Sequence, residues 1–151
     1  MTPSRIRAKV VADRASWIRR MLDGIRGLPT ESPEAFAADP RTAAAAESYL
    51  RRALEALLDL GRHVLAKGFG RGVAEYKEVP AELLKNGVLT PAQAGVLREM
   101  AGYRNRMVHF YDEVEVHELY EICTQSLDDI EATLDAILAW IDGHPEFVEP
   151  T

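Results

Sequence analysis

The chain has 151 residues, of which 47% are hydrophobic and 28% charged, as is typical of one soluble globular domain with its own core. Cys123 is the only cysteine, which excludes an internal disulfide and a cysteine-based metal cluster, so a reducing cytoplasm is the expected compartment. The N-terminus lacks the apolar run of a signal peptide. No window approaches the roughly 18 apolar residues of a membrane-spanning helix, so we expect no association with a membrane.

The charge changes sign along the chain. Residues 1–60 hold 10 Lys and Arg against 8 Asp and Glu, residues 61–110 hold 8 against 4, and residues 111–151 hold 12 acidic residues and no Lys or Arg. The basic middle can attract polyanions, whereas the acidic end, in a chain of net charge −6, opposes loose binding to nucleic acid. The acidic end is more simply explained as a solvated helix face.

Apolar residues at three-to-four spacing predict a first helix over residues 4–25. Its apolar positions are Ile6, Val10, Trp17, Met21 and Ile25. Gly27 and Pro29 end it, and a short turn over 33–38 follows, with Phe36 as an apolar plug.

A second long helix is expected over residues 41–67, with Asp39 as its N-cap and Pro40 at its first position. Its buried stripe consists of Leu50, Leu54, Leu57, Leu58, Gly61, Val64 and Leu65. Three glycines end the helix: Gly68, Gly70 and Gly72. They predict a flexible loop that Lys67 and Arg71 make basic. No strand precedes these glycines, so they are not a dinucleotide-binding fingerprint, and no cofactor is expected.

A weaker helical segment over 80–85 precedes a third long helix, expected over 91–107. Thr90 would cap this helix, Pro91 would occupy its first position, and Gln93 would reach back to close a capping box.

The last helix is expected over 114–141, with one nearly heptad seam. The seam residues are Val116, Leu119, Cys123, Leu127, Ile130, Leu134, Ile137 and Ile141. The predicted fold is all-α, an antiparallel bundle of four long helices plus short ones, with apolar side faces that favour a homodimer. Residues 1–142 form the single domain, and 143–151 a short frayed tail with His144 facing solvent.

The segment 103–111 gathers a fixed cation, an amide, an imidazole and a phenol. Arg104 is permanently charged and forked, which suits a phosphate, and His109 can exchange a proton near neutral pH. On a regular helix the two lie about 140° apart around the axis and roughly 7.5 Å apart along it. A swing of the long arginine, or a helix end near Val108, would bring them together. An extended chain from His109 would then place Tyr111 on the same side.

Simpler explanations remain open for these residues. Cations near a helix C-terminus complement the helix dipole and often have no other role. His109 and His117 have no third and fourth ligand at a recognisable spacing, so no metal site is expected. His63 is most simply a packing residue.

The chain resembles the HepT-like toxins of the HEPN domain superfamily over roughly residues 5–141, which makes the expected domain HEPN-like. The most specific match is segment 104–111, which fits the family's Arg-x4-His-x-Tyr pattern at Arg104, His109 and Tyr111. Three further segments occur in the expected order: 36–40, 47–60 and 86–89.

This resemblance implies a metal-independent endoribonuclease toxin that works as a homodimer, with two copies of the motif lining a cleft between subunits. It implies an RNA substrate, with transfer RNA as the family-based expectation, and an antitoxin partner that is a nucleotidyltransferase of the MntA type. It also implies that this partner adenylylates Tyr111. Phe110 departs from the family, which often has glycine there, and its bulk would narrow access to Tyr111.

The implied chemistry assigns a role to each group. His109 would move protons, which contributes about 10²- to 10⁴-fold in rate, and Arg104 would clamp the phosphate and stabilise charge on phosphorus. Asn105 would orient His109 or the RNA, and the product would carry a 2′,3′-cyclic phosphate. Further RNA contacts are expected from three basic residues: Lys67, Arg71 and Arg106.

Two other functions compete with the nuclease. A helical bundle can serve as a non-catalytic subunit that docks a nucleotidyltransferase, and the acidic end of the chain favours that alternative because it lowers RNA affinity. A nucleotide-binding protein acting through Arg104 and Arg106 is the third alternative.

Overall fold

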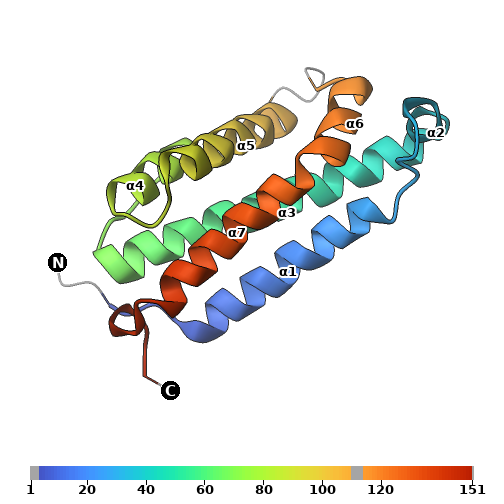
Figure 1. Cartoon of the computed structure of the whole chain (residues 1–151). Helices are drawn as coiled ribbons and strands as arrows, with labels where there is room; N and C mark the ends of the chain where they lie inside the picture. Colours follow the sequence, from blue (N-terminus) through green and yellow to red (C-terminus); the bar gives the residue numbers. More distant parts are fainter. Residues whose placement is uncertain (1–3, 110–113, 151) are drawn as a thin grey trace.

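The longest helix runs through the middle of an antiparallel bundle, as Figure 1 shows. The computed structural model describes residues 4–109 and 114–150. The four long helices are α1 (Ala8–Arg26), α3 (Pro40–Phe69), α5 (Pro91–His109) and α7 (Leu127–Asp142). Each packs on the next in a closed ring, α1 on α3, α3 on α5, α5 on α7 and α7 on α1. This arrangement confirms the predicted all-α bundle. Within the described residues, no helix is both long and apolar enough to cross a bilayer.

Shorter helices complete the described chain: α2 (Pro33–Ala37), η1 (Tyr76–Glu78), α4 (Val79–Lys85), α6 (Val116–Gln125) and η2 (Pro145–Phe147). The segment between α3 and α5 folds back so that α4 packs on both of these helices. This places η1 beside α5, where it can contribute to a surface at that helix's end.

The predicted starts of the second and third long helices are confirmed by capping hydrogen bonds. The Asp39 carboxylate accepts a hydrogen bond from the Arg41 amide at 2.9 Å. The amide of Gln93 donates to the Thr90 hydroxyl at 3.2 Å, and the amide of Thr90 donates to the Gln93 side chain at 2.9 Å, which is a reciprocal capping box. Of the three glycines predicted to end α3, Gly70 provides the left-handed C-cap, with φ of 67°.

The predicted buried stripe of α3 is confirmed. All of its members are buried, and the leucines among them have no exposed surface. Phe36 is fully buried as well, and it meets the ring of Tyr120 edge-on at 5.4 Å between centroids. The core therefore lies on the inner face of α3 and leaves the polar faces of that helix free to form sites.

The single helix expected over 114–141 is wrong, because α6 and α7 are separate helices. Ser126 lies between them with φ of −112° and ψ of −8°, outside regular helical geometry. Two residues earlier, the Thr124 hydroxyl donates to the Tyr120 carbonyl at 2.9 Å, a side-chain bond of the kind that bends helices. The seam residue Val116 is 45% exposed, so it lies outside the core.

Both ends of the chain also differ from prediction. Helix α1 begins at Ala8 because Ile6 is extended and donates its amide hydrogen to the Phe147 carbonyl at 2.7 Å. The tail is not frayed in its described part. The ring of His144 is half-buried and stacks on Trp140 at 4.3 Å. Local periodicity misses the contact between Ile6 and Phe147 because it joins residues from opposite ends of the chain.

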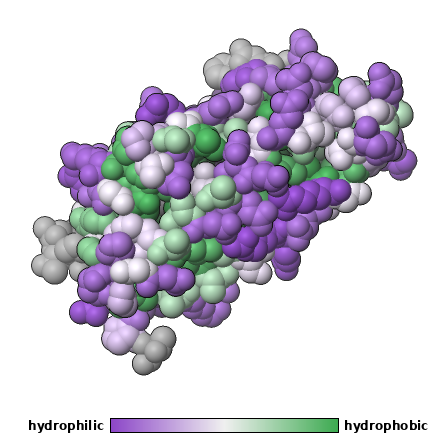
Figure 2. Space-filling model, viewed as in Figure 1, coloured by the Kyte–Doolittle hydropathy of each residue, from purple (hydrophilic) through white to green (hydrophobic). Residues whose placement is uncertain are grey.

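Arginines of α1 neutralise part of the acidic helix α7. Arg19 binds Glu131 and Asp135, each at 2.8 Å, and Arg26 binds Glu131 at 2.9 Å and Asp128 at 3.2 Å. Figure 2 shows a hydrophilic band across the middle of this face. Much of the negative charge on α7 is therefore held in ion pairs with α1.

Gly61 offers a test of the contact between α3 and α4. A Cβ atom there would lie 2.6 Å from Val79 Cγ1 and 3.1 Å from Leu83 Cδ1, whereas at Gly95 of α5 it would meet no described atom within 4 Å. Gly61→Ala is expected to lower the free energy of unfolding by about 1–2 kcal/mol, because the clash outweighs the helix propensity of alanine. Gly95→Ala should raise it by about 0.5–1 kcal/mol. Urea unfolding measures both, and equal effects would contradict this packing.

Candidate functional site

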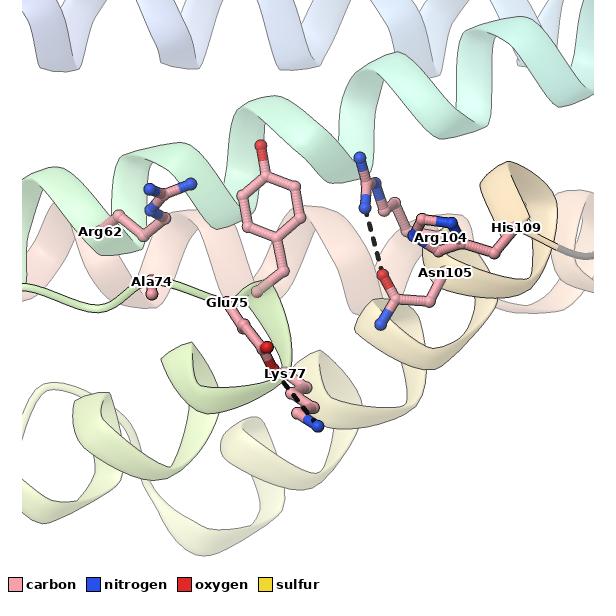
Figure 3. A pocket seen from close by; sticks show the side chains of 8 residues that line it. Arg62, Ala74, Glu75, Lys77, Arg104, Asn105 and His109 are labelled. Atoms are coloured by element: carbon pink, nitrogen blue, oxygen red, sulfur yellow. Dashed lines mark hydrogen bonds and ion pairs between the residues drawn. The ribbon is translucent and has the colours of Figure 1, made fainter.

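Three residues of the predicted motif line one pocket at the end of α5. Arg104, Asn105 and His109 share a pocket of about 470 Å³ with Arg62 of α3 and with residues 74–77 (Figure 3). The pocket is thus built from two helices and the connection that packs between them. A guanidinium, an amide and an imidazole are exposed in the same space.

Arg104 is held in place on three sides. Its Nε and Nη2 donate to one oxygen of Glu55 at 3.0 and 2.8 Å, and its Nη1 donates to the Asn105 carbonyl oxygen at 3.2 Å. Its guanidinium lies over the ring of Tyr76, 4.7 Å from the centroid. A guanidinium has five N–H donors, so within the described residues two remain for an anion in the pocket.

A row of polar residues on α3 supports this arrangement. Glu55 also binds Arg51 at 3.0 Å, while Asp59, one turn further along, accepts the hydroxyl hydrogen of Tyr76 at 2.7 Å. Arg62 lies 3.7 Å from Asp59, and its guanidinium is 5.3 Å from the Tyr76 ring centroid. The Tyr76 ring therefore contacts the guanidinium groups of two arginines, one from α3 and one from α5.

Tyr76 stays protonated at neutral pH. Burial, together with the hydrogen bond to the Asp59 carboxylate, raises the pKa of Tyr76 to about 12. Its hydroxyl is already bonded to that carboxylate, so it is poorly placed to exchange a proton with a substrate. Its role here is to present an aromatic surface to cations.

His109 is the last residue of α5, so the helix does not end at Val108. The motif therefore follows the alternative in which the long side chain of Arg104 swings, since both residues line the pocket while five positions apart on one helix. Phe110 and Tyr111 lie outside the described residues, and the proximity of Tyr111 to His109 stays a prediction.

Three predicted RNA-binding residues are not among the described ones that line this pocket. Arg106 is two residues after Arg104, roughly 200° around the helix, and it binds Glu118 of α6 at 2.8 and 3.0 Å. Arg71 lies 3.5 Å from Glu82, beside a different hollow. Neither these two nor Lys67 are among the described residues that line the pocket. Their contact with RNA stays a prediction.

Several residues of the site were not identified from the sequence: Glu55, Asp59, Arg62 and Tyr76. A signal was present on α3, where Arg51, Glu55, Asp59 and Arg62 recur at helical spacing off the buried stripe. Such a polar face does not reveal which helix it will meet. Among the described residues, no group of three or more His, Cys, Asp or Glu is arranged to hold a metal ion.

Comparisons with known proteins agree on one family. A family model described as ribonuclease HepT-like matches residues 18–137. The curated tRNA nuclease HepT of Aphanizomenon flos-aquae (strain 2012/KM1/D3) is 26% identical over 118 residues, which cover 78% of this chain and 80% of the relative.

Solved structures share the fold. The tri-AMPylated HEPN toxin of Shewanella oneidensis in complex with MNT antitoxin matches with a TM-score of 0.78 at 22% identity, covering 86% of this chain and 97% of the matched chain. A toxin–antitoxin structure of an MntA–HpeT mutant matches with a TM-score of 0.76 at 21% identity, covering 87% of this chain and 98% of the matched chain. At these identities the likeness establishes a common helical bundle.

The ion pair between Glu55 and Arg104 can be tested through stability. The two side chains are 25% and 18% exposed, so Glu55→Gln leaves a largely buried guanidinium without its counter-charge. We expect the free energy of unfolding to fall by about 1–2 kcal/mol. The matched control is Asp13→Asn, which removes the same charge from an exposed pair with Lys9 and should change little. Equal effects in urea unfolding would show that Glu55 does not hold Arg104.

Proposed function

Because the chain belongs to the HepT-like ribonuclease family, we propose that it is an endoribonuclease toxin that cuts RNA in the pocket of Arg104, Asn105 and His109. The observation that supports this most is the meeting of Arg104 and His109 in one pocket, with the arginine fixed by Glu55. A cation that is held in place before the substrate arrives can stabilise developing charge without reorganising.

The reaction proposed for this pocket uses the RNA's own 2′-hydroxyl as nucleophile. The 2′-oxygen loses its proton and bonds to phosphorus, the bond from phosphorus to the 5′-oxygen breaks, and the 5′-oxygen gains a proton. His109 carries out a proton transfer, and the remaining donors of Arg104 bind the phosphate oxygens. Asn105 keeps the guanidinium oriented through its bond to Nη1. The products carry a 2′,3′-cyclic phosphate and a 5′-hydroxyl, and the steps require no metal ion.

In an in-line displacement the entering 2′-oxygen and the leaving 5′-oxygen lie on opposite sides of phosphorus, so one imidazole does not reach both of them. A homodimer that brings two motif copies to one cleft supplies a second imidazole, which is why we include the dimer in the proposal. The relative named as a tRNA nuclease makes transfer RNA the first substrate to test.

The proposed partner is a nucleotidyltransferase antitoxin of the MNT or MntA type. The structurally similar toxins are found in complexes with such antitoxins, and one of them is tri-AMPylated. In our proposal the hydroxyl of Tyr111 attacks the α-phosphate of ATP and pyrophosphate leaves. The added adenylyl group carries a phosphodiester charge, which would compete with RNA for Arg104.

A non-catalytic docking subunit is the second candidate function. The segment after position 110 holds 12 acidic residues and no Lys or Arg. This negative charge favours the docking subunit because it opposes RNA affinity. Such a subunit would bind the nucleotidyltransferase and leave RNA intact.

Replacing His109 tests the nuclease. The purified protein is expected to cut transfer RNA in EDTA and to leave cyclic-phosphate ends, and His109→Ala should slow cleavage by about 10² or more. The control is His117→Ala, whose side chain is 71% exposed on α6, outside the pocket. Unchanged cleavage by His109→Ala would refute the assignment of His109. RNA left intact by the wild-type protein would support the docking subunit.

The intact mass of the protein tests the proposed adenylylation of Tyr111. Incubation with an MntA-type nucleotidyltransferase and ATP should add about 329 Da per adenylyl group, a modification that also adds negative charge, and should reduce RNA cleavage. Tyr111→Phe should remove the mass increment, whereas Tyr103→Phe, on the preceding helix, should keep it. Full modification of the Tyr111→Phe protein would mean that another residue is the acceptor.

A further inference from the structure

A second hollow of about 430 Å³ lies between α1 and α3 and is not part of the proposed active pocket. Its described lining, which we name the α1–α3 groove, consists of Arg14, Trp17, Arg51, Arg52, Glu55, Ala56 and Asp59. In Figure 3, α3 runs between α1 on one side and α5, with Arg104 and His109, on the other. The groove and the pocket therefore border opposite flanks of the same helix.

The two hollows share a wall. Glu55 and Asp59 line the groove, and the same carboxylates bind pocket residues: Glu55 accepts both hydrogen bonds from Arg104, and Asp59 accepts one from Tyr76. Glu55 and Asp59 therefore form the wall of α3 between the two hollows, and a chain bound in the pocket would cross this wall to enter the groove.

The lining of the two hollows is positively charged although the whole chain is not. Six Lys and Arg residues line them against three Asp and Glu residues, in a chain whose net charge is −6. The carboxylates of the shared wall are already bound by Arg51, Arg62 and Arg104. Among the described residues, Arg14 and Arg52 form no hydrogen bond or ion pair, and both are exposed. Unpaired guanidinium groups in a groove attract phosphates.

The groove also contains an aromatic surface suited to the stacking of a nucleobase. Trp17 is half-buried, so its ring is fixed against the core while part of it faces the groove. The guanidinium of Arg20 lies over the indole, 5.0 Å from the ring. Single-stranded RNA is commonly bound by stacking its bases on aromatic rings or on guanidinium planes.

We propose that the α1–α3 groove is a subsite for single-stranded RNA that holds nucleotides flanking the bond cut in the pocket. One base stacks on the pair formed by Trp17 and Arg20, and Arg14 and Arg52 bind phosphates of the same strand. This inference rests on the proposed nuclease function, and it makes a long strand a better substrate than a dinucleotide, which fills the pocket alone.

Binding can be measured without cleavage. In the full chain carrying His109→Ala, the affinity for a single-stranded RNA of about ten nucleotides should fall by roughly 5- to 100-fold in Trp17→Ala, the range expected for one lost stacking contact. Arg52→Ala should weaken binding and reduce the salt dependence by about one counterion. If loss of the half-buried Trp17 disturbs folding, Arg52→Ala still tests the groove, because Arg52 is exposed and its loss should not affect the core. The matched control is Arg41→Ala, since Arg41 is on the same helix, 90% exposed and outside the groove.

Cleavage gives the second readout. With His109 intact, Trp17→Ala and Arg52→Ala should lower kcat/KM for the long RNA and leave cleavage of a ribodinucleotide at the wild-type rate. Long-RNA binding and cleavage equal to those of Arg41→Ala would overturn the subsite. Loss of affinity for the nucleotidyltransferase with RNA binding unchanged would also overturn it, and would make the groove a protein interface.

The subsite and the nuclease can fail separately. A wild-type protein that cuts no RNA, but whose RNA binding depends on Trp17 and Arg52, refutes the nuclease and supports the groove. A protein that cuts RNA, but whose groove variants bind like the control, refutes the groove and leaves the nuclease standing.

Discussion

The ion pair between Arg104 and Glu55 is the contact on which the site depends, because it fixes a cation from α5 against α3. Partly buried pairs stabilise a fold little, since desolvation offsets most of the attraction. In this site the pair instead fixes the position of the Arg104 guanidinium. Both bonds to Glu55 come from the Nε side of the guanidinium, and Asn105 takes one donor of Nη1. The donors that remain belong to the terminal nitrogens, which suits a phosphate in the pocket.

Net charge is a poor guide to the local field of this protein. Helix α1 presents arginines in two directions: Arg19 and Arg26 bind carboxylates of α7, whereas Arg14 faces the groove beside α3. Three of the five acidic residues of α7 are thus paired with Arg19 and Arg26. Arg14 is not used in these pairs, so its positive charge acts on the groove. An overall charge of −6 is therefore compatible with a surface that binds a polyanion.

Local sequence signals predicted the starts of α3 and α5, the buried stripe of α3 and the motif on α5, because capping residues and apolar spacing act within a few residues. They did not predict what depends on distant neighbours. In the sequence, Glu55 is one more polar position on an amphipathic helix. Only the packing of α5 against α3 shows that it binds Arg104. The bridge from Ile6 to the C-terminal end was missed for the same reason. The break at Ser126 has a local cause, because the bond from the Thr124 hydroxyl to the backbone overrides a regular apolar pattern.

The proposed silencing of the enzyme follows from the same arginine. Arg104 lines the pocket and is bound by a carboxylate and by the amide of Asn105, and the described residues leave two of its N–H donors for a phosphate brought there. Tyr111 is two residues beyond His109 in the sequence. A phosphodiester on its hydroxyl would compete with the RNA backbone for those donors as a tethered ligand, at high effective concentration. Inhibition then requires only occupancy of the anion site, with no rearrangement of the bundle.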